Sequence, residues 1–388
     1  MKRNLFAWLL VVCMMLTLCA LAEGDLEEVS IFIFDADGAV SEEITPELEP
    51  TPEPTPDPSE PQYEADGSIL LTMSFTGDFT IGENVQHNGK SIFEKEFEKQ
   101  DENIHFPLRN VKDLLLADDL TMINFEGTLT TAGRNPEKKN NDFLFRAAPA
   151  FVDMLPAGGV DTVSLENNHV LDMGEEGLQE TKDTLLSAGI PYASEGDPAV
   201  FYVKGVKVGS LAYQTFGGRH DEIIQKLPGD IGALRAEGCQ VVIVSYHWGA
   251  ELDYYPNDNQ VRLGRATVDA GADLVIGHHS HRINPIEYYN GKYICYSLGN
   301  FSFAGNSKPS DMASYIFQIR IRVKDGEATS EAIKLIPIRI SSRTDYNDFA
   351  PTPYTKDTNI EAVIKTLRQN GKRLEYAVES YPLKWPDE

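Results

Sequence analysis

The sequence contains little cysteine and comparatively little positive charge. Its four cysteines, of which only Cys239 and Cys295 lie beyond residue 22, form no CxxC or Cys/His zinc-finger spacing, so no thiolate metal site is indicated. Those two either remain buried free thiols or form one disulfide bond, since each borders or lies in an apolar strand-like run. The 34 Lys and Arg residues stand against 60 Asp and Glu, a formal net charge of -26. This balance disfavours nucleic acid as a partner and disfavours electrostatic docking on anionic membranes.

The first 22 residues predict export. Lys2 and Arg3 precede an apolar run, and Ala20-Leu21-Ala22 matches a small-x-small cleavage site. We therefore expect a signal peptide at 1–22 and a secreted or cell-surface protein. The alternative is an uncleaved membrane anchor, because the apolar run lies at the short edge of what spans a bilayer.

The rest of the chain divides by composition. Residues 23–44 form an acidic N-terminal segment to which the sequence assigns no role. Residues 45–67 are a linker, with seven prolines in the 17 positions 45–61, and such a segment is extended and cannot pack a core. The folded domain is expected at 68–345, followed by a C-terminal extension at 346–388 with one helix at 359–369.

Short apolar strands alternate with helical patterns after residue 68, which indicates an α/β fold. A hairpin is expected at 201–213, turning at Lys204-Gly205. From residue 313 the pattern alternates on both sides of Asp325-Gly326, which predicts a C-terminal β-hairpin from 315–323 and 328–340. The other expected strands are 69–75, 120–125, 162–165, 241–245, 273–276 and 293–297, and the helices are 106–117, 149–157, 175–188, 229–237 and 259–270.

Polar side chains suited to chemistry follow the ends of these strands. They are Asp78, Asn124, Glu126, Asn167, Asn168, His169, His247, His278, His279, His281 and Asn300. Because the carboxyl ends of parallel strands share one rim, distant loops can meet there. Imidazole with carboxylate and amide oxygen is a ligand mixture for zinc, iron or manganese. Such a cation lowers the pKa of bound water and offsets phosphoryl charge.

Each element taken alone also has an ordinary structural explanation. The exception is the segment 277–281, GHHSH, because packing does not explain three histidines in four residues. The alternatives for the others are a helix cap for Asp78, a cap or turn for Asn168, a hydrogen-bonded core histidine for His247, and a salt bridge from Glu126 to Arg134 or Arg146.

Six motifs occur in a fixed order along the chain: FTGD at 75–78, INFEGTL at 123–129, SLENNHVLDMGEEGL at 164–178, YHWGAE at 246–251, GADLVIGHHSH at 271–281 and YSLGNFSF at 296–303. In this combination the sequence resembles the CapA family, the poly-gamma-glutamate capsule-synthesis proteins, over roughly 68–340. That family is similar in fold to the calcineurin-like metallophosphoesterases.

The resemblance implies a metallophosphoesterase-like β-sandwich flanked by helices, with one or two divalent metal ions (Mn, Fe or Zn) at the rim. It implies that His169 contacts a substrate phosphate or protonates a leaving group. Candidates to support the metal ligands from behind are Asn124, Asn167, His278 and Asn300. The implied metal ligands are Asp78, Glu126, Asn168, His247, His279 and His281, with Glu126 the bridging candidate.

The sequence also departs from the phosphoesterase pattern. Asp78 is followed by Phe79-Thr80 where Asp-x-His is usual, so one metal position is expected to be weak or empty. Asn124-Phe125-Glu126 replaces the usual Gly-Asp motif. Glu166 and Ser280 stand where the family commonly has a small residue and a proline.

Two hypotheses about function follow. The first is a metal-dependent hydrolase acting on a phosphoester or another bond in an envelope polymer; a Ser-His-Asp hydrolase is disfavoured because no Gly-x-Ser-x-Gly turn is present. The second is a non-catalytic surface component that binds or guides an anionic polymer, alongside membrane-bound polymer-synthesis machinery. In so acidic a protein, the metal or local basic residues such as Arg219 and Arg282 would have to attract the polymer.

Overall fold

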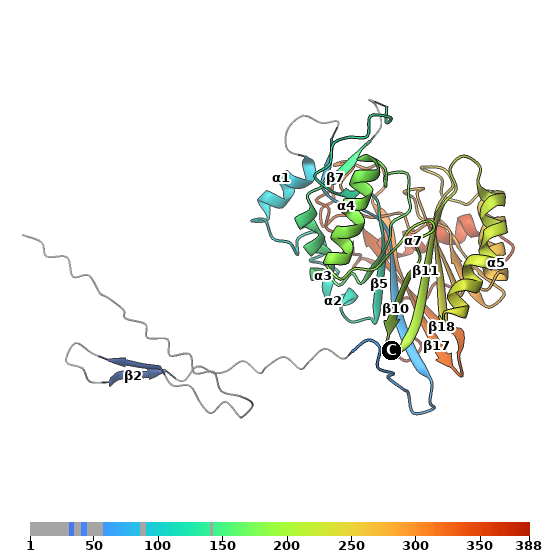
Figure 1. The fold of residues 1–388 in the computed structure, drawn as a ribbon, viewed down its shortest axis with the longest axis horizontal. Helices are drawn as coiled ribbons and strands as arrows, with labels where there is room; N and C mark the ends of the chain where they lie inside the picture. Colours follow the sequence, from blue (N-terminus) through green and yellow to red (C-terminus); the bar gives the residue numbers. More distant parts are fainter. Residues whose placement is uncertain (1–30, 35–39, 45–56, 86–90, 140–142) are drawn as a thin grey trace, which may run out of the picture. The chain divides into compact units, whose positions relative to one another are not determined.

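The computed structural model describes residues 31–34, 40–44, 57–85, 91–139 and 143–388. The expected signal peptide at 1–22 lies outside these residues, as do most of 23–44 and the linker up to residue 56. The chain forms two units, Met1–Pro56 and Asp57–Glu388. In the first, β1 (Ile31–Phe34) pairs antiparallel with β2 (Val40–Ile44) (Figure 1). Over the described ranges, no helix is both long and apolar enough to cross a membrane.

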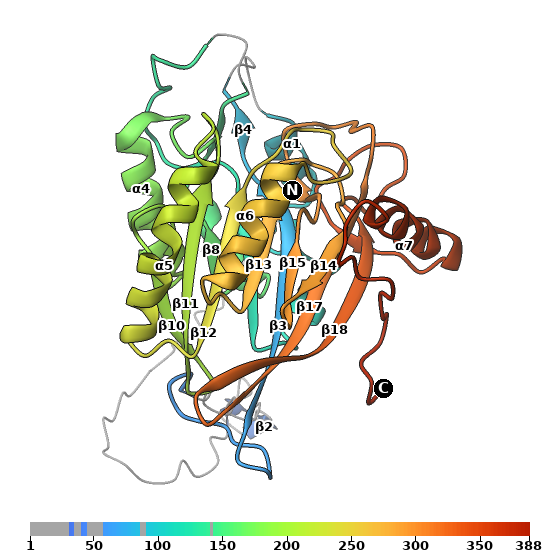
Figure 2. The same cartoon turned by 90° about the vertical axis from the view of Figure 1, so that its right-hand side faces the viewer.

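Residues 57–388 build two β-sheets packed face to face between layers of helices (Figures 1 and 2). The eight-stranded sheet has the path β19 (Thr352–Pro353), β18 (Glu327–Arg339), β17 (Ala313–Lys324), β3 (Ile69–Thr80), β5 (Leu120–Phe125), β8 (Thr162–Ser164) and β9 (Tyr192–Ala193), and β16 (Asn300–Phe303) also pairs with β3. The six-stranded sheet has the order β10 (Ala199–Val203), β11 (Val206–Gln214), β12 (Val241–His247), β13 (Leu274–His278), β15 (Lys292–Cys295) and β14 (Ile286–Tyr289). A small third sheet joins β4 (Glu83–Asn84), β7 (Phe145–Ala147) and β6 (Thr128–Leu129).

The helices cover the outer faces of the two large sheets. Figure 2 shows α5 and α6 over the six-stranded sheet, with α7 beside β14, β17 and β18. The helices are α1 (Ile92–Lys99), α2 (Lys112–Leu115), the 3-10 helix η1 (Pro149–Asp153), α3 (Met154–Ala157), α4 (Gly174–Ser187), α5 (His220–Ala236), α6 (Asp258–Asp269) and α7 (Asp357–Gly371).

Alternation along the strands divides the apolar residues among three cores. Leu71, Met73 and Phe75 of β3 face Ile243 of β12 and Ile276 of β13 in the core between the sheets. The residues one position along point the other way, because successive side chains of a strand face opposite sides. Thus Val242 and Val244 pack under α5 and α6, and Ile123 and Phe125 pack under α1 to α4. Burying a side chain of this size contributes about 1.5–3 kcal/mol.

The fold class expected from the sequence is therefore confirmed: an α/β sandwich flanked by helices. β3, β5, β8 and β9 are mutually parallel, as are β11, β12, β13 and β15. The C-terminal hairpin turns at Asp325-Gly326, both with positive φ, and its strand β17 pairs directly with β3. The hairpin at Lys204-Gly205 is also present.

The expected helix at 106–117 is wrong over its first half. The structure keeps only α2, and the residues before it form consecutive turns, with Leu108 N donating to His105 O and Val111 N to Leu108 O. The Arg109 guanidinium donates to Phe106 O at 2.7 Å, so a side chain satisfies a carbonyl that a helix would use. The apolar spacing is real, but turns bury it.

Cys239 and Cys295 are both buried free thiols. Cys295 belongs to the core between the sheets, whereas Cys239 packs on the helix-covered face of the six-stranded sheet. They therefore lie on opposite sides of one sheet, which settles the alternative that the sequence leaves open.

Candidate metal centre

The residues predicted from strand ends gather at one rim, where the carboxyl ends of strands from both large sheets meet. Asp78 lies near the end of β3 and Asn124 near the end of β5, in the eight-stranded sheet. His247 ends β12 and His278 ends β13, in the six-stranded sheet. Both large sheets therefore contribute residues to the site.

A close approach of two chain segments holds Asp78 in place. Asp78 N donates to Gly299 O at 2.9 Å, and Asp78 pairs with Asn300 of β16. A Cβ atom at Gly77 would lie 1.9 Å from Gly299 O, so only glycine permits this contact. The segment 296–303 is thereby fixed against the strand that carries Asp78.

The loop after β13 has an uncommon backbone. His279 has φ 94° and His281 has φ 52°, a region that non-glycine residues rarely adopt. Such conformations cost on the order of 1–3 kcal/mol each and persist where the surroundings enforce them. Here the loop places His279 Nδ1 2.9 Å from His247 Nε2, and His281 Nδ1 2.8 Å from Asn300 Oδ1.

Glu126 lies at the centre of the cluster. Its Oε1 is 3.7 Å from His169 Nε2, 3.8 Å from His247 Nε2 and 3.9 Å from His281 Nε2. Neither carboxylate oxygen of this fully buried residue accepts a hydrogen bond from the described part of the protein. In the part of the chain that the structure describes, Glu126 pairs with histidines and not with Arg134 or Arg146, the partners that the sequence leaves open.

Asp78 is the second buried carboxylate. Asn124 Nδ2 donates to its Oδ1 at 2.8 Å, and His278 Nδ1 lies 3.6 Å from the same oxygen. His281 Nδ1 lies 3.1 Å from its Oδ2. The helix-cap alternative for Asp78 does not apply, because the residue sits within a strand.

Burial and mutual charge shift the acid–base equilibria of the cluster. Burial raises the pKa of Glu126 well above its usual value, and the charge of Asp78 adds to this. Burial alone would also raise the pKa of Asp78, but the hydrogen bond and charge of His281, with smaller contributions from His278 and Asn124, hold it below the usual value.

The histidines divide into two groups. Burial lowers the pKa of His278 to about 4, and burial together with the nearby His281 lowers that of His279 to about 4. Burial and the neighbouring histidines lower the pKa of His247 as well. Burial acts the same way on His281, but Glu126 and Asp78 outweigh it and raise its pKa to about 10. Neutral imidazoles beside unpaired carboxylate oxygens are suited to bind a cation.

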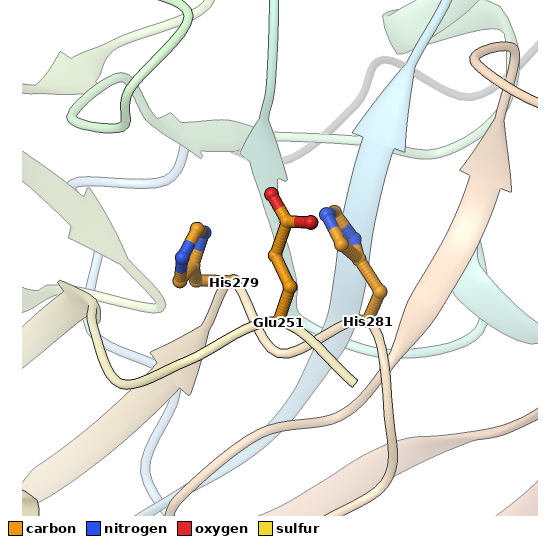
Figure 3. A group of neighbouring side chains, drawn as sticks. All are labelled: Glu251, His279 and His281. Carbon is orange, nitrogen blue, oxygen red and sulfur yellow. The ribbon is translucent and has the colours of Figure 1, made fainter. Parts of the chain in front are cut away.

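Two sets of side chains bring their ligand atoms within 4.8 Å of one another: Asp78, Glu126 and His281, and Glu251, His279 and His281. Figure 3 shows the Glu251 carboxylate between the rings of His279 and His281. Glu251 is absent from the residues selected by sequence, although it closes the YHWGAE motif. Its position four residues after His247, in the same strand-end loop, is the signal that could have found it.

The asparagines have different surroundings. Asn167 Nδ2 donates to Phe125 O at 2.8 Å and lies 3.4 Å from Asn124 Oδ1, so it braces the loop behind the cluster. Asn168 Oδ1 is buried and accepts no hydrogen bond from the described residues. Within the described ranges no hydrogen bond joins its side chain to the other predicted ligands, and it does not cap α4, which starts after Met173.

His169 is oriented by a residue that the sequence reading missed. Its Nδ1 lies 2.7 Å from Asp172 Oδ2, which also accepts from Phe145 N at 2.7 Å, while Lys138 pairs with the other oxygen at 2.9 Å. The spacing of three residues on the turn after β8 is the available signal. This leaves His169 Nε2 directed at the cluster.

A pocket of about 390 Å³ opens beside these residues. Its lining combines members of the cluster with aromatic and apolar side chains and one arginine. The lining residues are Phe143, Phe145, His169, Glu251, Leu252, His281, Arg282, Asn300, Phe303, Gly305, Asn306, Pro309 and Ser310.

Comparison with known proteins places the chain among relatives. The family model described as "Bacterial capsule synthesis protein PGA_cap" matches residues 72–304. The "PGA biosynthesis protein CapA" of Bacillus subtilis is 30% identical over 336 residues, covering 80% of this chain and 81% of the relative. The "Capsule biosynthesis protein CapA" of Bacillus anthracis is 27% identical over 326 residues, covering 78% and 74%. A solved calcineurin-like phosphoesterase, YfkN from Bacillus subtilis, has a TM-score of 0.42 at 16% identity, covering 78% of this chain and 98% of that one.

Proposed function

The chain belongs to the bacterial capsule synthesis protein family PGA_cap, and from that premise we propose that it is an exported, metal-dependent hydrolase of an acidic capsule or envelope polymer such as poly-gamma-glutamate. The proposal covers a phosphoester or another bond in that polymer. One observation carries it: both oxygens of the buried Glu126 have no hydrogen-bond donor among the described residues, while three histidine nitrogens lie within 3.9 Å of Oε1.

A divalent cation, Mn, Fe or Zn, fits this donor set. An unpaired buried carboxylate is costly, and a cation at that position offsets the cost. Asp78, Glu126 and His281 would hold one ion, with His247 Nε2 3.8 Å from Glu126 Oε1; Glu251, His279 and His281 offer a second group. When bound, such an ion supplies an activated water and neutralises charge on the reacting group.

The chain's own residues supply orientation and proton transfer. Asp172 accepts from His169 Nδ1–H and fixes the direction of the ring, so that Nε2 can take up a proton, as an imidazolium paired with Asp172, and pass it to a leaving group. The rings of Phe145 and Phe303 pack on His169 and His281 at 4.5 and 4.9 Å and keep water from that side of the pocket.

Elemental analysis of the purified protein, followed by turnover with that metal restored, tests the proposal. We expect metal retention together with hydrolysis on a panel of phosphodiesters, phosphomonoesters and γ-glutamyl amides. His279→Ala should remove most of the turnover, by at least about 100-fold if it removes a ligand. His105→Ala is the control, because in the described residues the His105 side chain is hydrogen-bonded only to the Ala157 carbonyl. Metal-loaded protein with no turnover on the panel would show the hydrolase proposal to be wrong.

Export and surface location are part of the same proposal. The leader at 1–22 and the Pro-rich residues 45–56, which precede the folded unit, motivate it, since a spacer would hold that unit away from a surface. The N-terminal sequence of protein recovered from the cell exterior is the test. A start at Glu23 supports cleavage, whereas an intact leader on membrane-bound protein supports the anchor instead.

A second candidate function is non-catalytic binding of an anionic polymer. Arg282 favours it, because this arginine lines the pocket beside the cluster. Arg219 does not, because Glu195 and Glu222 already neutralise it. Binding that persists unchanged after chelation and in His281→Ala would favour a metal-independent binding role over a metal-bridged one.

A further inference from the structure

Resting on the acidic polymer of the proposed function, we infer that Arg282 is a specificity-determining residue: a receptor for one carboxylate of the polymer, next to the candidate metal centre. The reacting segment of the chain would lie at the histidine cluster, and a neighbouring carboxylate would bind the Arg282 guanidinium.

The first support is an unusual buried charge. Arg282 is only 7% exposed, yet in the described part of the chain the hydrogen-bond acceptors of its guanidinium include no carboxylate. Its Nη1 donates to His281 O and its Nη2 to Ser310 Oγ, both at 2.8 Å. Both acceptors are neutral, and a buried charge without a counter-charge is costly.

Other arginines of the domain that hold buried carboxylates show the contrast. Arg109 pairs with Asp348 at 2.9 Å, Arg235 with Asp273 at 2.6 Å, and Arg265 with Glu287 at 2.7 Å. Asp311, the residue after Ser310, accepts from Tyr254 Oη at 2.6 Å. The Tyr254 ring lies 5.7 Å from the guanidinium carbon and supports it by a cation–π contact.

The second support is the shape of the pocket around Arg282. Phe145, Phe303 and Leu252 line the same pocket of about 390 Å³. A polymer of glutamate offers carboxylates joined by methylene groups, so the charged groups suit Arg282 and the methylenes suit the apolar wall. The guanidinium is a planar fork that binds a carboxylate through two parallel hydrogen bonds, which lysine cannot do.

The third support is the link to the metal centre. Arg282 follows His281, and its guanidinium holds the His281 carbonyl. The candidate ligand and the receptor therefore share one turn, and the distance between them is fixed by the backbone. A polymer bound at both points would be held in one register relative to His169 and the cluster.

Calorimetric binding of a γ-linked glutamate trimer to the full chain, with chelator present, tests this inference without relying on turnover. The neutral counterpart, with its free α-carboxylates converted to amides, is the matched ligand. We expect Arg282→Gln to weaken trimer binding about 10- to 100-fold, since a charge-assisted hydrogen bond is worth roughly 1.5–3 kcal/mol. Arg282→Lys should show an intermediate loss, and Ser310→Ala a loss of about three-fold.

Arg219→Gln is the control, because Arg219 is already paired and does not line the pocket. Equal binding of the trimer and its amide would overturn the inference. Unchanged affinity in both Arg282→Lys and Ser310→Ala would also overturn it. These two milder variants keep the inference testable if Arg282→Gln does not express. Inorganic phosphate that displaces the trimer and depends equally on Arg282 would overturn the assignment to carboxylate. Arg282-dependent binding without hydrolysis would leave this inference standing and defeat only the hydrolase.

Discussion

Two fully buried glutamates occupy opposite situations in this molecule. Glu287 accepts from Arg265 Nη2 at 2.7 Å and Nε at 3.2 Å, from Tyr296 Oη at 2.7 Å and from Tyr376 N at 3.3 Å. Glu126 accepts from none of the described donors. The difference separates a carboxylate that the fold satisfies from one that it leaves unsatisfied, and the second kind points to a bound partner.

Substitution of Glu287 should have the largest effect on the free energy of unfolding. Glu287→Gln should lower the free energy of unfolding by about 3–5 kcal/mol, because it leaves the Arg265 guanidinium without its buried counter-charge. Denaturant unfolding measures this. Glu375→Gln is the matched control: Glu375 also reaches Arg265, at 3.4 Å, but it is exposed, so its loss should cost less than about 1 kcal/mol. Similar losses in both variants would contradict the comparison.

Glu126→Gln should act in the opposite direction. In chelator-treated protein we expect the free energy of unfolding to rise by about 1–2 kcal/mol, since an unsatisfied buried charge is removed. The same variant should lose bound metal, as elemental analysis would show. Glu166→Gln is the control, because Glu166 is buried yet accepts from Gln214 Nε2 at 2.6 Å and from Glu195 N at 2.9 Å. If Glu166→Gln also gained stability, hydrogen bonding would not distinguish carboxylates that the fold satisfies from those that it leaves unsatisfied.

Asp118, just before β5 and far from the histidines, is an intermediate case between Glu287 and Glu126, because in the described part of the chain only one of its carboxylate oxygens accepts a hydrogen bond. Thr121 Oγ1 donates to its Oδ2 at 2.9 Å, and its Oδ1 has no partner among the described residues. Burial raises the pKa of Asp118 to about 7, with the negative charges of Asp161 and Asp119 adding to the effect.

The folded protein therefore keeps the Asp118 proton between about pH 4 and 7, while the unfolded chain releases it, so this residue makes stability fall as pH rises through that window. Asp118→Asn should remove that part of the slope and stabilise the protein by about 1–2 kcal/mol at pH 8, where the wild type carries the whole penalty. Unfolding curves at pH 4 and pH 8 measure it. If the free energy of unfolding depends on pH equally in Asp118→Asn and in the wild type, Asp118 is not the source of that dependence.

Local turn chemistry explains which parts of the fold could be predicted from sequence. Lys204-Gly205 and Asp325-Gly326 take the left-handed backbone that two-residue hairpins require, and both hairpins were found. Asn290-Gly291, with φ of 47° and 80°, carries the same signal between β14 and β15, but the sequence reading assigned only one strand there. The helix expected at 106–117 is wrong over its first half, because periodicity does not register that the Arg109 side chain takes the Phe106 carbonyl.

The sequence predicted the residues at the centre of the candidate site better than the neighbouring residues Asp172 and Glu251. Strand ends in a parallel arrangement select Asp78, Glu126, His247 and the 278–281 loop, and the structure brings these together. Asp172 and Glu251 were missed although each follows a selected histidine by three or four residues in a strand-end loop, because that spacing alone does not say which way the side chain points. The sharing of the site between two sheets was likewise invisible in the strand pattern and came from the family resemblance.

The contact between Gly77 and Gly299 has a consequence for biosynthesis. The entire six-stranded sheet lies between these two glycines in the sequence, so a ribosome releases Asp78 long before the segment that locks it. Late, long-range pairing of this kind is slow to form. The cation-binding arrangement is therefore a product of the completed chain, and any truncated or nicked form lacking β16 should be unable to assemble it.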